Sequence, residues 1–298
     1  MANYSKNILV TGAAGLIGRE ICSQLVSSGH LVTAVDNNKR FPNFTPKGKF
    51  IKSNLKEYLD SKVNKFDYIY HMAAINGTAS FYSDPNSVLS NNVLADLDIF
   101  AYTKTNPNTR LIYASSSEVI AGTNIIPTPE ISDIEINNIH NPRWSYRLPK
   151  MLAENYLTNS PIDYVIVRYF NVFSEYSGTG HFVKDIVNKI KENKFVLQSP
   201  NETRSFCYVA DAVRATIKIA KLAPNEIINI GSNEEITILE AANIIANALG
   251  TTPEWSFIES KPGSVLRRQP DITKLLEYYP EFKSESFSES ITRIKDML

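Results

Sequence analysis

Short apolar runs alternate with amphipathic stretches along the first part of the chain. The runs 7–12 (NILVTG) and 30–36 (HLVTAVD) flank the stretch 15–29 (GLIGREICSQLVSSG), and a later run covers 66–74 (FDYIYHMAA). Continuous apolar strands separated by helices are typical of a parallel sheet that is buried on both faces. The pattern therefore predicts an α/β fold that begins with a βαβ unit.

Further elements of the same kind follow up to about residue 170, and the pattern changes beyond it. The predicted helices cover 85–105 and 144–157, and the predicted strands cover 110–114 and 162–168. Beyond residue 171 the predicted elements are helices near 182–192, 210–222 and 238–249 and a short strand in FCYV (206–209). We expect a Rossmann-type doubly wound parallel sheet in residues 1–170 and a smaller mixed α/β substrate-binding domain in residues 171–298, with elements that could interleave.

Composition and charge exclude several classes of protein. The 298 residues are 43% hydrophobic, and 31 basic residues balance 31 acidic ones without any basic run, so we expect no nucleic-acid partner. Cys22 and Cys207 lie far apart and outside metal-ligand spacing, so no metal site and no disulfide is predicted. No apolar stretch reaches the ~18 residues that span a bilayer. We therefore expect no membrane partner and a reduced, cytoplasmic setting.

A glycine-rich turn follows the first predicted strand and opens the first predicted helix. Gly12, Gly15 and Gly18 stand in the sequence TGAAGLIG, where glycines allow a tight turn and let a backbone approach a pyrophosphate. Asp36 ends the next strand, where a carboxylate accepts hydrogen bonds from an adenosine ribose and repels the extra phosphate of NADP. The pattern predicts NAD as the cofactor, although the neighbouring Lys39 and Arg40 leave mixed cofactor use open.

Tyr146 and Lys150 are four residues apart and share one face of a predicted helix. A tyrosine with a pKa near ~10 needs a shift of about 3 units to act as a base at neutral pH, and a neighbouring ammonium supplies part of it. A Tyr/Lys pair at this spacing also occurs on helix faces that are exposed to solvent. Here, however, Ser116 stands at the carboxyl end of an apolar strand, where such folds bind ligands, and its hydroxyl could orient a substrate. Glu118 could take part in proton transfer or merely cap a turn.

The motifs TGxxGxxG, HMAA, SSSEV, YxxxK and RYFN occur in this order and resemble the extended short-chain dehydrogenase/reductase family. Its members are nucleotide-sugar epimerases, dehydratases and decarboxylases. The resemblance implies that Tyr146 takes the proton of a sugar hydroxyl, usually the one at C4, as a hydride passes to NAD. Lys150 would hold the nicotinamide ribose, and Ser116 and Glu118 would complete the catalytic set.

The resemblance also assigns binding residues along the chain. The implied cofactor contacts are Gly12, Gly15, Leu16, Ile17, Gly18, Asp36, Asn54, Leu55, Met72, Ala73, Ala74, Asn92, Tyr146 and Lys150. The implied substrate contacts are Thr78, Ser116, Ser117, Asn171, Arg204 and Arg268. Relatives commonly form dimers through the helix that carries the Tyr/Lys pair, so a homodimer is expected.

We therefore expect an NAD-dependent epimerase or dehydratase that oxidises a hydroxyl of a nucleotide-diphosphate sugar for surface-polysaccharide synthesis. The Ser-Ser-Glu pattern at 116–118 and the segment NPRWSYRLPK (141–150) resemble decarboxylases of UDP-glucuronate type, which stay an alternative. A 4-dehydrogenase that releases the keto sugar is a second alternative, and a catalytically idle NAD-binding regulatory protein is a third. Proline 149, just before Lys150, removes one helical hydrogen bond and could kink the predicted helix.

Overall fold

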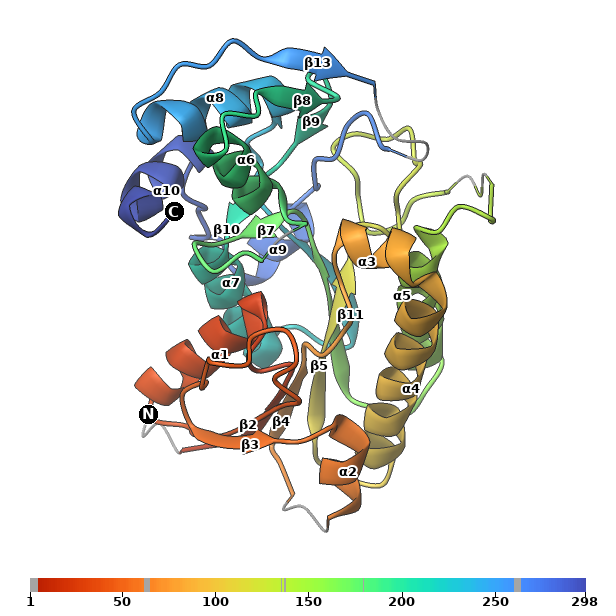
Figure 1. Ribbon diagram of the computed structural model, residues 1–298. Helices are drawn as coiled ribbons and strands as arrows, with labels where there is room; N and C mark the ends of the chain where they lie inside the picture. The colour runs from red at the N-terminus through yellow and green to blue at the C-terminus, as the bar shows by residue number, and fades with distance from the viewer. Residues whose placement is uncertain (1–4, 62–64, 135, 137, 179, 260–263) are drawn as a thin grey trace.

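The computed structural model describes residues 5–61, 65–134, 136, 138–178, 180–259 and 264–298. Its centre is a seven-stranded sheet in the order β11-β6-β5-β4-β1-β2-β3, in which every pair of neighbours is parallel (Figure 1). The strands are β1 (Asn7–Thr11), β2 (Leu31–Asp36), β3 (Lys49–Lys52), β4 (Tyr68–His71), β5 (Arg110–Ser116), β6 (Tyr164–Tyr169) and β11 (Glu226–Ile230). The predicted Rossmann-type parallel sheet is confirmed.

Helices separate the strands, as the alternating pattern predicted. The first half of the chain holds α1 (Leu16–Ser27), α2 (Leu55–Asp60), α3 (Thr78–Ser83), α4 (Pro85–Lys104) and α5 (Trp144–Thr158). The second half holds α6 (Phe182–Lys191), α7 (Val209–Leu222), α8 (Ile238–Ala248), α9 (Thr273–Tyr278), α10 (Phe287–Ile294) and a 3₁₀ turn (Lys295–Met297). None of the helices in the described part of the chain is long and apolar enough to cross a membrane.

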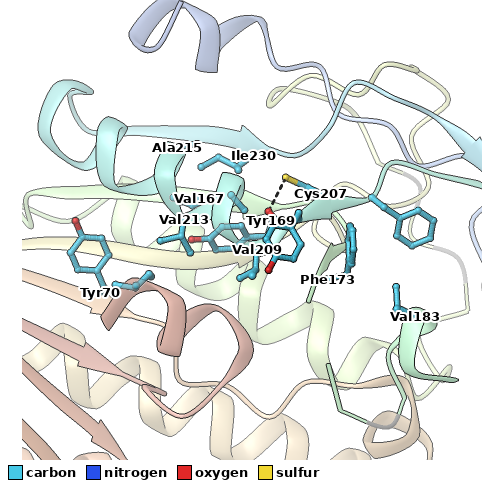
Figure 2. Close-up of a cluster of buried hydrophobic side chains, with 14 of the residues drawn as sticks. Tyr70, Val167, Tyr169, Phe173, Val183, Cys207, Val209, Val213, Ala215 and Ile230 are labelled. Atoms are coloured by element: carbon cyan, nitrogen blue, oxygen red, sulfur yellow. Dashed lines mark hydrogen bonds between the residues drawn. The ribbon is translucent and has the colours of Figure 1, made fainter. Parts of the chain in front are cut away.

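The sheet is buried on both faces because its strands carry apolar residues at successive positions. Leu111 and Tyr113 of β5 belong to the buried cluster under α2, α4 and α5, whereas Ile112 belongs to the larger cluster under α1 and α7. The side chains of a strand alternate between faces, so the run LIYA at 111–114 serves both cores. Figure 2 shows part of the larger cluster, with Val167 of β6 and Val213 of α7 among the labelled side chains.

The second half of the chain completes the sheet and adds a smaller layer above its carboxyl edge (Figure 1). β11 pairs with β6, and α7 packs against α1. Three two-stranded sheets lie outside the main one: β7 (Val172–Phe173) with β10 (Cys207–Tyr208), β8 (Val196–Gln198) with β13 (Ser256–Ile258), and β9 (Thr203–Arg204) with β12 (Ile236–Thr237). Residues beyond 170 therefore contribute to the sheet as well as to the upper layer.

The strand order reverses between β1 and β4, because the chain moves from β1 to β2 and β3 on one side and from β4 to β5 and β6 on the other. In open parallel sheets, a ligand crevice forms outside the carboxyl ends of the strands at such a reversal. The glycine turn after β1 and the serines at the end of β5 both lie at this edge. The topology thus brings the two predicted sites together.

Candidate active site

The glycine turn between β1 and α1 packs so tightly that larger side chains do not fit. A Cβ atom on Gly12, whose φ is +64°, would lie 2.6 Å from the backbone nitrogen of Ala73, and one on Gly18 would lie 2.2 Å from the carbonyl oxygen of Gly12. No described side chain caps the amino end of α1, where Gly15 is the N-cap. The N–H groups of its first turn are therefore available to the phosphates of a dinucleotide.

Asp36 is anchored beside this turn at the end of β2. One carboxylate oxygen accepts a hydrogen bond from the Ala14 N–H at 3.0 Å, and the other accepts one from the Asn38 N–H at 2.7 Å. Each oxygen keeps a free lone pair, since a carboxylate has about four acceptor sites. Asp36 is thus held in place and still able to accept a ribose hydroxyl.

A cavity of about 400 Å³ runs from the glycine turn to the upper layer, a size common for small-molecule sites. It brings together most of the residues that the sequence predicted. These are Gly12, Gly15, Leu16, Ile17, Gly18, Met72, Ala74, Ser116, Ser117, Glu118, Tyr146, Lys150, Asn171, Arg204 and Arg268.

The other predicted residues with described side chains are not among those that line the cavity: Asp36, Asn54, Leu55, Ala73 and Asn92. The Asn92 amide is bound to the backbone of Ile75 through both its oxygen, at 2.7 Å, and its nitrogen, at 3.1 Å. Asn54 is the N-cap residue of α2, where Leu55 is the first helical residue. The Ala73 N–H donates to the Thr11 hydroxyl, and Asp36 is held by the N–H groups of Ala14 and Asn38. The Thr78 side chain lies outside the described residues.

Ser116, Tyr146 and Lys150 meet at the carboxyl end of β5. The Tyr146 ring stacks on Phe81 with centroids 5.1 Å apart, and its hydroxyl is hydrogen-bonded to Ser116. Burial raises the pKa of Tyr146, and the hydrogen bond with Ser116 opposes that shift. Lys150 is 1% exposed and donates to the Tyr113 hydroxyl at 3.0 Å. The three groups therefore form one contiguous site.

Proline 149 does not break the helix that carries this site. α5 is continuous from Trp144 to Thr158, with the proline inside it. Both Tyr146 and Lys150 are buried and line the same cavity. The proline therefore does not interrupt the helix that carries the Tyr/Lys pair.

Glu118 is held between two arginines that come from distant parts of the chain. Its Oε1 atom lies 2.9 Å from Arg143, which precedes α5, and 2.8 Å from Arg268. Burial alone would raise the pKa of Glu118, but Arg268 and Arg143 outweigh burial and lower it to about 2. The Nε–H of Arg268 is buried and has no hydrogen-bond partner among the described residues. Glu118 is therefore a carboxylate at neutral pH, and Arg268 keeps a donor for an anion.

Arg204 lies at the upper end of the cavity. It donates to the carbonyl oxygens of Thr203 and Val265 and pairs with Glu202 at 2.8 Å. Burial lowers its pKa to about 10, with a smaller contribution from the charge of Arg268 and opposition from Glu202. Asn171, which has a left-handed φ of +40°, donates its side-chain amide to the carbonyl of Ser205.

Several cavity residues were not predicted as site residues. Arg40 donates to the Asn76 carbonyl at 3.2 Å and contacts His181 Nε2 at 2.9 Å, so it links the β2 loop to the start of α6. Burial and the charge of Arg40 lower the pKa of His181 to about 4, so its neutral ring can accept from the guanidinium. Arg143 could have been found from the sequence, because it stands three residues before Tyr146. Nothing local in the sequence indicates His181.

Comparison with known proteins decides the family. The model of the NAD dependent epimerase/dehydratase family matches residues 8–231. The chain belongs to this family. This family's enzymes are NAD-dependent, which confirms the predicted cofactor and the resemblance to extended short-chain dehydrogenases/reductases. The chain is therefore an enzyme and not an idle binding protein.

Proteins with different activities, a decarboxylase and two 4-epimerases, resemble this chain along nearly its whole length. A UDP-N-acetyl-alpha-D-glucosaminuronate decarboxylase of Bacillus cytotoxicus is 31% identical, covering 91% of each chain. The structure of a UDP-galactose 4-epimerase has a TM-score of 0.83 at 26% identity, covering 98% of this chain and 99% of the other. The UDP-N-acetylglucosamine 4-epimerase of Methanobrevibacter ruminantium M1 also has a TM-score of 0.83 at 26% identity, covering 99% of each chain.

The NAD-dependent assignment agrees with the residues of the glycine turn. The turn leaves no room for a Cβ at Gly12 or Gly18, and the uncapped start of α1 offers N–H groups to a pyrophosphate. Asp36 would bind the adenosine ribose, and Lys150 would lie near the nicotinamide ribose. NAD, when bound, supplies the acceptor for a hydride.

Proposed function

We propose that this enzyme oxidises the C4 hydroxyl of a nucleotide-diphosphate sugar and returns the hydride from NADH to the sugar within the same turnover, as an epimerase or dehydratase does. One observation carries the proposal: the hydrogen-bonded hydroxyls of Ser116 and Tyr146, with Lys150 buried beside them, open into the same cavity as the glycine turn. The decarboxylase and the UDP-N-acetylglucosamine 4-epimerase named above, which cover 91% and 99% of this chain, act on UDP-sugars, and this favours that substrate class.

In the proposed reaction, Tyr146 is the base and Ser116 positions the substrate. The sugar hydroxyl loses its proton to the ionised Tyr146 oxygen while the hydrogen on the same carbon leaves as a hydride, so a carbonyl forms. Lys150, as an ammonium close to the tyrosine, favours the ionised form of Tyr146. Ser116 donates to the reacting oxygen and keeps it within reach of the tyrosine.

The upper layer would bind the nucleotide diphosphate. Arg204, Arg268 and Asn171 line that end of the cavity, and guanidinium groups offer planar pairs of donors to phosphate oxygens. Since these residues all follow residue 170, we propose that residues 171–298 form the substrate-binding part and residues 1–170 the NAD-binding part. β11 and α7 are the exceptions that return to the sheet.

A second candidate is the decarboxylation of a sugar uronate. It is favoured by the buried cluster of Glu118, Arg143 and Arg268 next to Ser116, because two arginines and one carboxylate leave one positive charge uncompensated. A substrate carboxylate would compensate it. A ketone at C4 also makes a carboxylate at C6 easy to lose, because the electrons that remain can delocalise into the carbonyl.

The test is an incubation of the purified enzyme with matched neutral and uronate forms of UDP-, GDP-, CDP- and dTDP-sugars, followed by mass spectrometry and NADH absorbance. A product of unchanged mass without net NADH supports an epimerase, and loss of water supports a dehydratase. Loss of carbon dioxide supports the second candidate. Lasting NADH would point to a dehydrogenase that releases the keto sugar and would refute internal recycling.

Tyr146→Phe checks the role of the base. We expect no measurable turnover but unchanged NAD binding, because the phenyl ring preserves the contact with Phe81. Tyr156→Phe is the matched control, since it removes a hydroxyl from the same helix while its ring stays stacked on Phe100 at 4.8 Å. Full activity in the Tyr146 variant would refute the mechanism.

We also propose that the enzyme is a homodimer in the cytoplasm. α4 and α5 lie together on the outside of the sheet (Figure 1). Several of their leucine side chains are exposed to solvent. Leu94 is 60% exposed, and Leu97 of α4 and Leu152 of α5 are exposed as well. A second copy of this surface would bury them. Cys22 and Cys207 are both free thiols, which suits a reducing compartment.

A further inference from the structure

A row of hydrogen-bonded polar side chains lies buried behind the Tyr/Lys pair. Lys150 donates to the Tyr113 hydroxyl at 3.0 Å, and that hydroxyl donates to Asp96 Oδ2 at 2.7 Å. Asp96 Oδ1 lies 3.1 Å from His71 Nε2, and His71 Nδ1 lies 2.7 Å from the Thr11 hydroxyl. Each of these five residues is at most 1% exposed. The row thus links α5, β5, α4, β4 and β1 in succession.

One arrangement of protons satisfies every bond in this row. The Ala73 N–H donates to the Thr11 hydroxyl, which leaves the Thr11 O–H free to donate to His71 Nδ1. His71 then carries its proton on Nε2 and donates to Asp96, which also accepts from Tyr113. In this arrangement His71 is neutral. Only the Tyr113 hydroxyl then lies between the negative charge of Asp96 and the positive charge of Lys150.

The other carboxylates near Lys150 already have cationic partners. Glu154 is buried on the same helix, but both its oxygens bind Arg168 of β6, at 2.8 and 2.6 Å. Glu118 is held by the two arginines described above. Within the described residues, no carboxylate comes within ion-pair distance of Lys150 itself. Asp96 pairs with His71, which is neutral in the arrangement above, so the charge of Asp96 is left to act on Lys150 through Tyr113.

We propose that Asp96 is a positioning residue that keeps Lys150 protonated through Tyr113, and so keeps Tyr146 able to act as a base. A fully buried ammonium is costly unless an opposite charge lies close. Burial lowers the pKa of Lys150, and the charge of Asp96, followed by that of Glu154, acts against this shift. The inference rests on the proposed function, because it concerns the base of that reaction.

Asp96 also has a direct effect on Tyr146 that runs in the opposite direction. A negative charge nearby makes a phenol harder to ionise, so Asp96 by itself raises the pKa of Tyr146. If this repulsion were its main effect, removing the charge would make Tyr146 a better base. If Asp96 instead maintains the charge of Lys150, removing it makes Tyr146 a poorer base. The sign of the change separates the two.

The experiment compares Asp96→Asn with the unmodified enzyme, both saturated with NAD. The tyrosines are labelled with ¹³C at Cζ and titrated by NMR, and the Tyr146 signal is identified from its loss in Tyr146→Phe. We expect the pKa of Tyr146 to rise by about one unit, which lowers the ionised fraction about tenfold at pH values below that pKa. The acid limb of the kcat profile should move to higher pH by the same amount.

Asp98→Asn is the matched control, because it removes the same charge from the same helix at a position outside the row. Its Tyr146 titration should equal that of the unmodified enzyme. Should Asp96→Asn fail to fold, Tyr113→Phe breaks the same link and should raise the Tyr146 pKa as well.

A lowered or unchanged Tyr146 pKa in the first variant that folds would overturn the proposal. The NMR titration needs no turnover, so its result is independent of the substrate. If no nucleotide sugar reacts with the unmodified enzyme, the proposed function fails while the titration still decides the role of Asp96.

Discussion

Replacing Glu118 by glutamine removes the carboxylate that Arg143 and Arg268 share, while preserving its shape. Burial opposes ionisation of this group, yet the two arginines bring its pKa down from the ordinary 4.5 to about 2. A depression of roughly 2.5 units, at about 1.36 kcal/mol each, corresponds to a contribution of about 3 kcal/mol to stability at neutral pH. We expect Glu118→Gln to lose an amount of that order, because it leaves two largely buried arginines without a counter-charge.

The sign of the pH dependence follows from the direction of the pKa change. The folded-state pKa is depressed, so the stabilisation is fully present above the unfolded value near 4.5 and is lost as the pH falls toward 2. Urea denaturation of both proteins should therefore show a constant difference between about pH 5.5 and pH 8. The difference should begin to shrink only below about pH 5.

Glu254→Gln is the matched control, since Glu254 is exposed and does not line the cavity. The stability of this variant should equal that of the unmodified enzyme within about 0.5 kcal/mol. Two results would refute the reasoning. A stability loss below about 1 kcal/mol in Glu118→Gln would mean that the arginines contribute little. A difference that already shrinks between about pH 7 and pH 6 would mean that Glu118 titrates near neutrality and could exchange protons with a substrate.

Three further predictions concern the cofactor site and the exposed helices. Asp36→Ala should lower the preference for NAD over NADP by about tenfold or more in competition binding, because a charged acceptor for the ribose is lost. Gly18→Ala should abolish NAD binding measured by calorimetry, since its Cβ would lie 2.2 Å from the Gly12 carbonyl oxygen. The double variant Leu94→Glu, Leu97→Glu should sediment as a monomer if α4 forms the dimer contact; an unchanged sedimentation coefficient would place that contact elsewhere.

The long elements could be predicted from the sequence because each carries its own periodic signal. The helix expected at 144–157 spans Trp144–Thr158, and the strand expected at 110–114 spans Arg110–Ser116. The short strands of the upper layer were mostly missed, since pairs such as β9 with β12 contain only two residues each. Their pairing depends on the tertiary arrangement and not on local preference.

The contacts that tune the site could not be predicted, because they join residues that are far apart in the sequence. Glu118 and Arg268 are separated by 150 positions, and nothing near Glu118 indicates that its oxygen faces two guanidinium groups. Asp96 is similar: it looks like one of several polar residues on α4 and is 1% exposed. A motif identifies the groups that react, whereas burial and distant partners determine their protonation.

The charges in and behind the cavity divide between its two ends, and this division bears on the reaction. At the cofactor end the charges of Lys150 and Asp96 offset each other through Tyr113, and the backbone N–H groups at the start of α1 are the groups that would bind the pyrophosphate of NAD. At the substrate end Glu118 compensates one of its two arginine partners, and Arg268 keeps an unused N–H. The surplus side-chain charge of this cluster therefore lies at the end where the proposed substrate would bind. Because Glu118 stands two residues after Ser116, the surplus charge would lie near the reacting sugar of the proposed substrate, where a carboxylate on that sugar would be stabilised more than a neutral group.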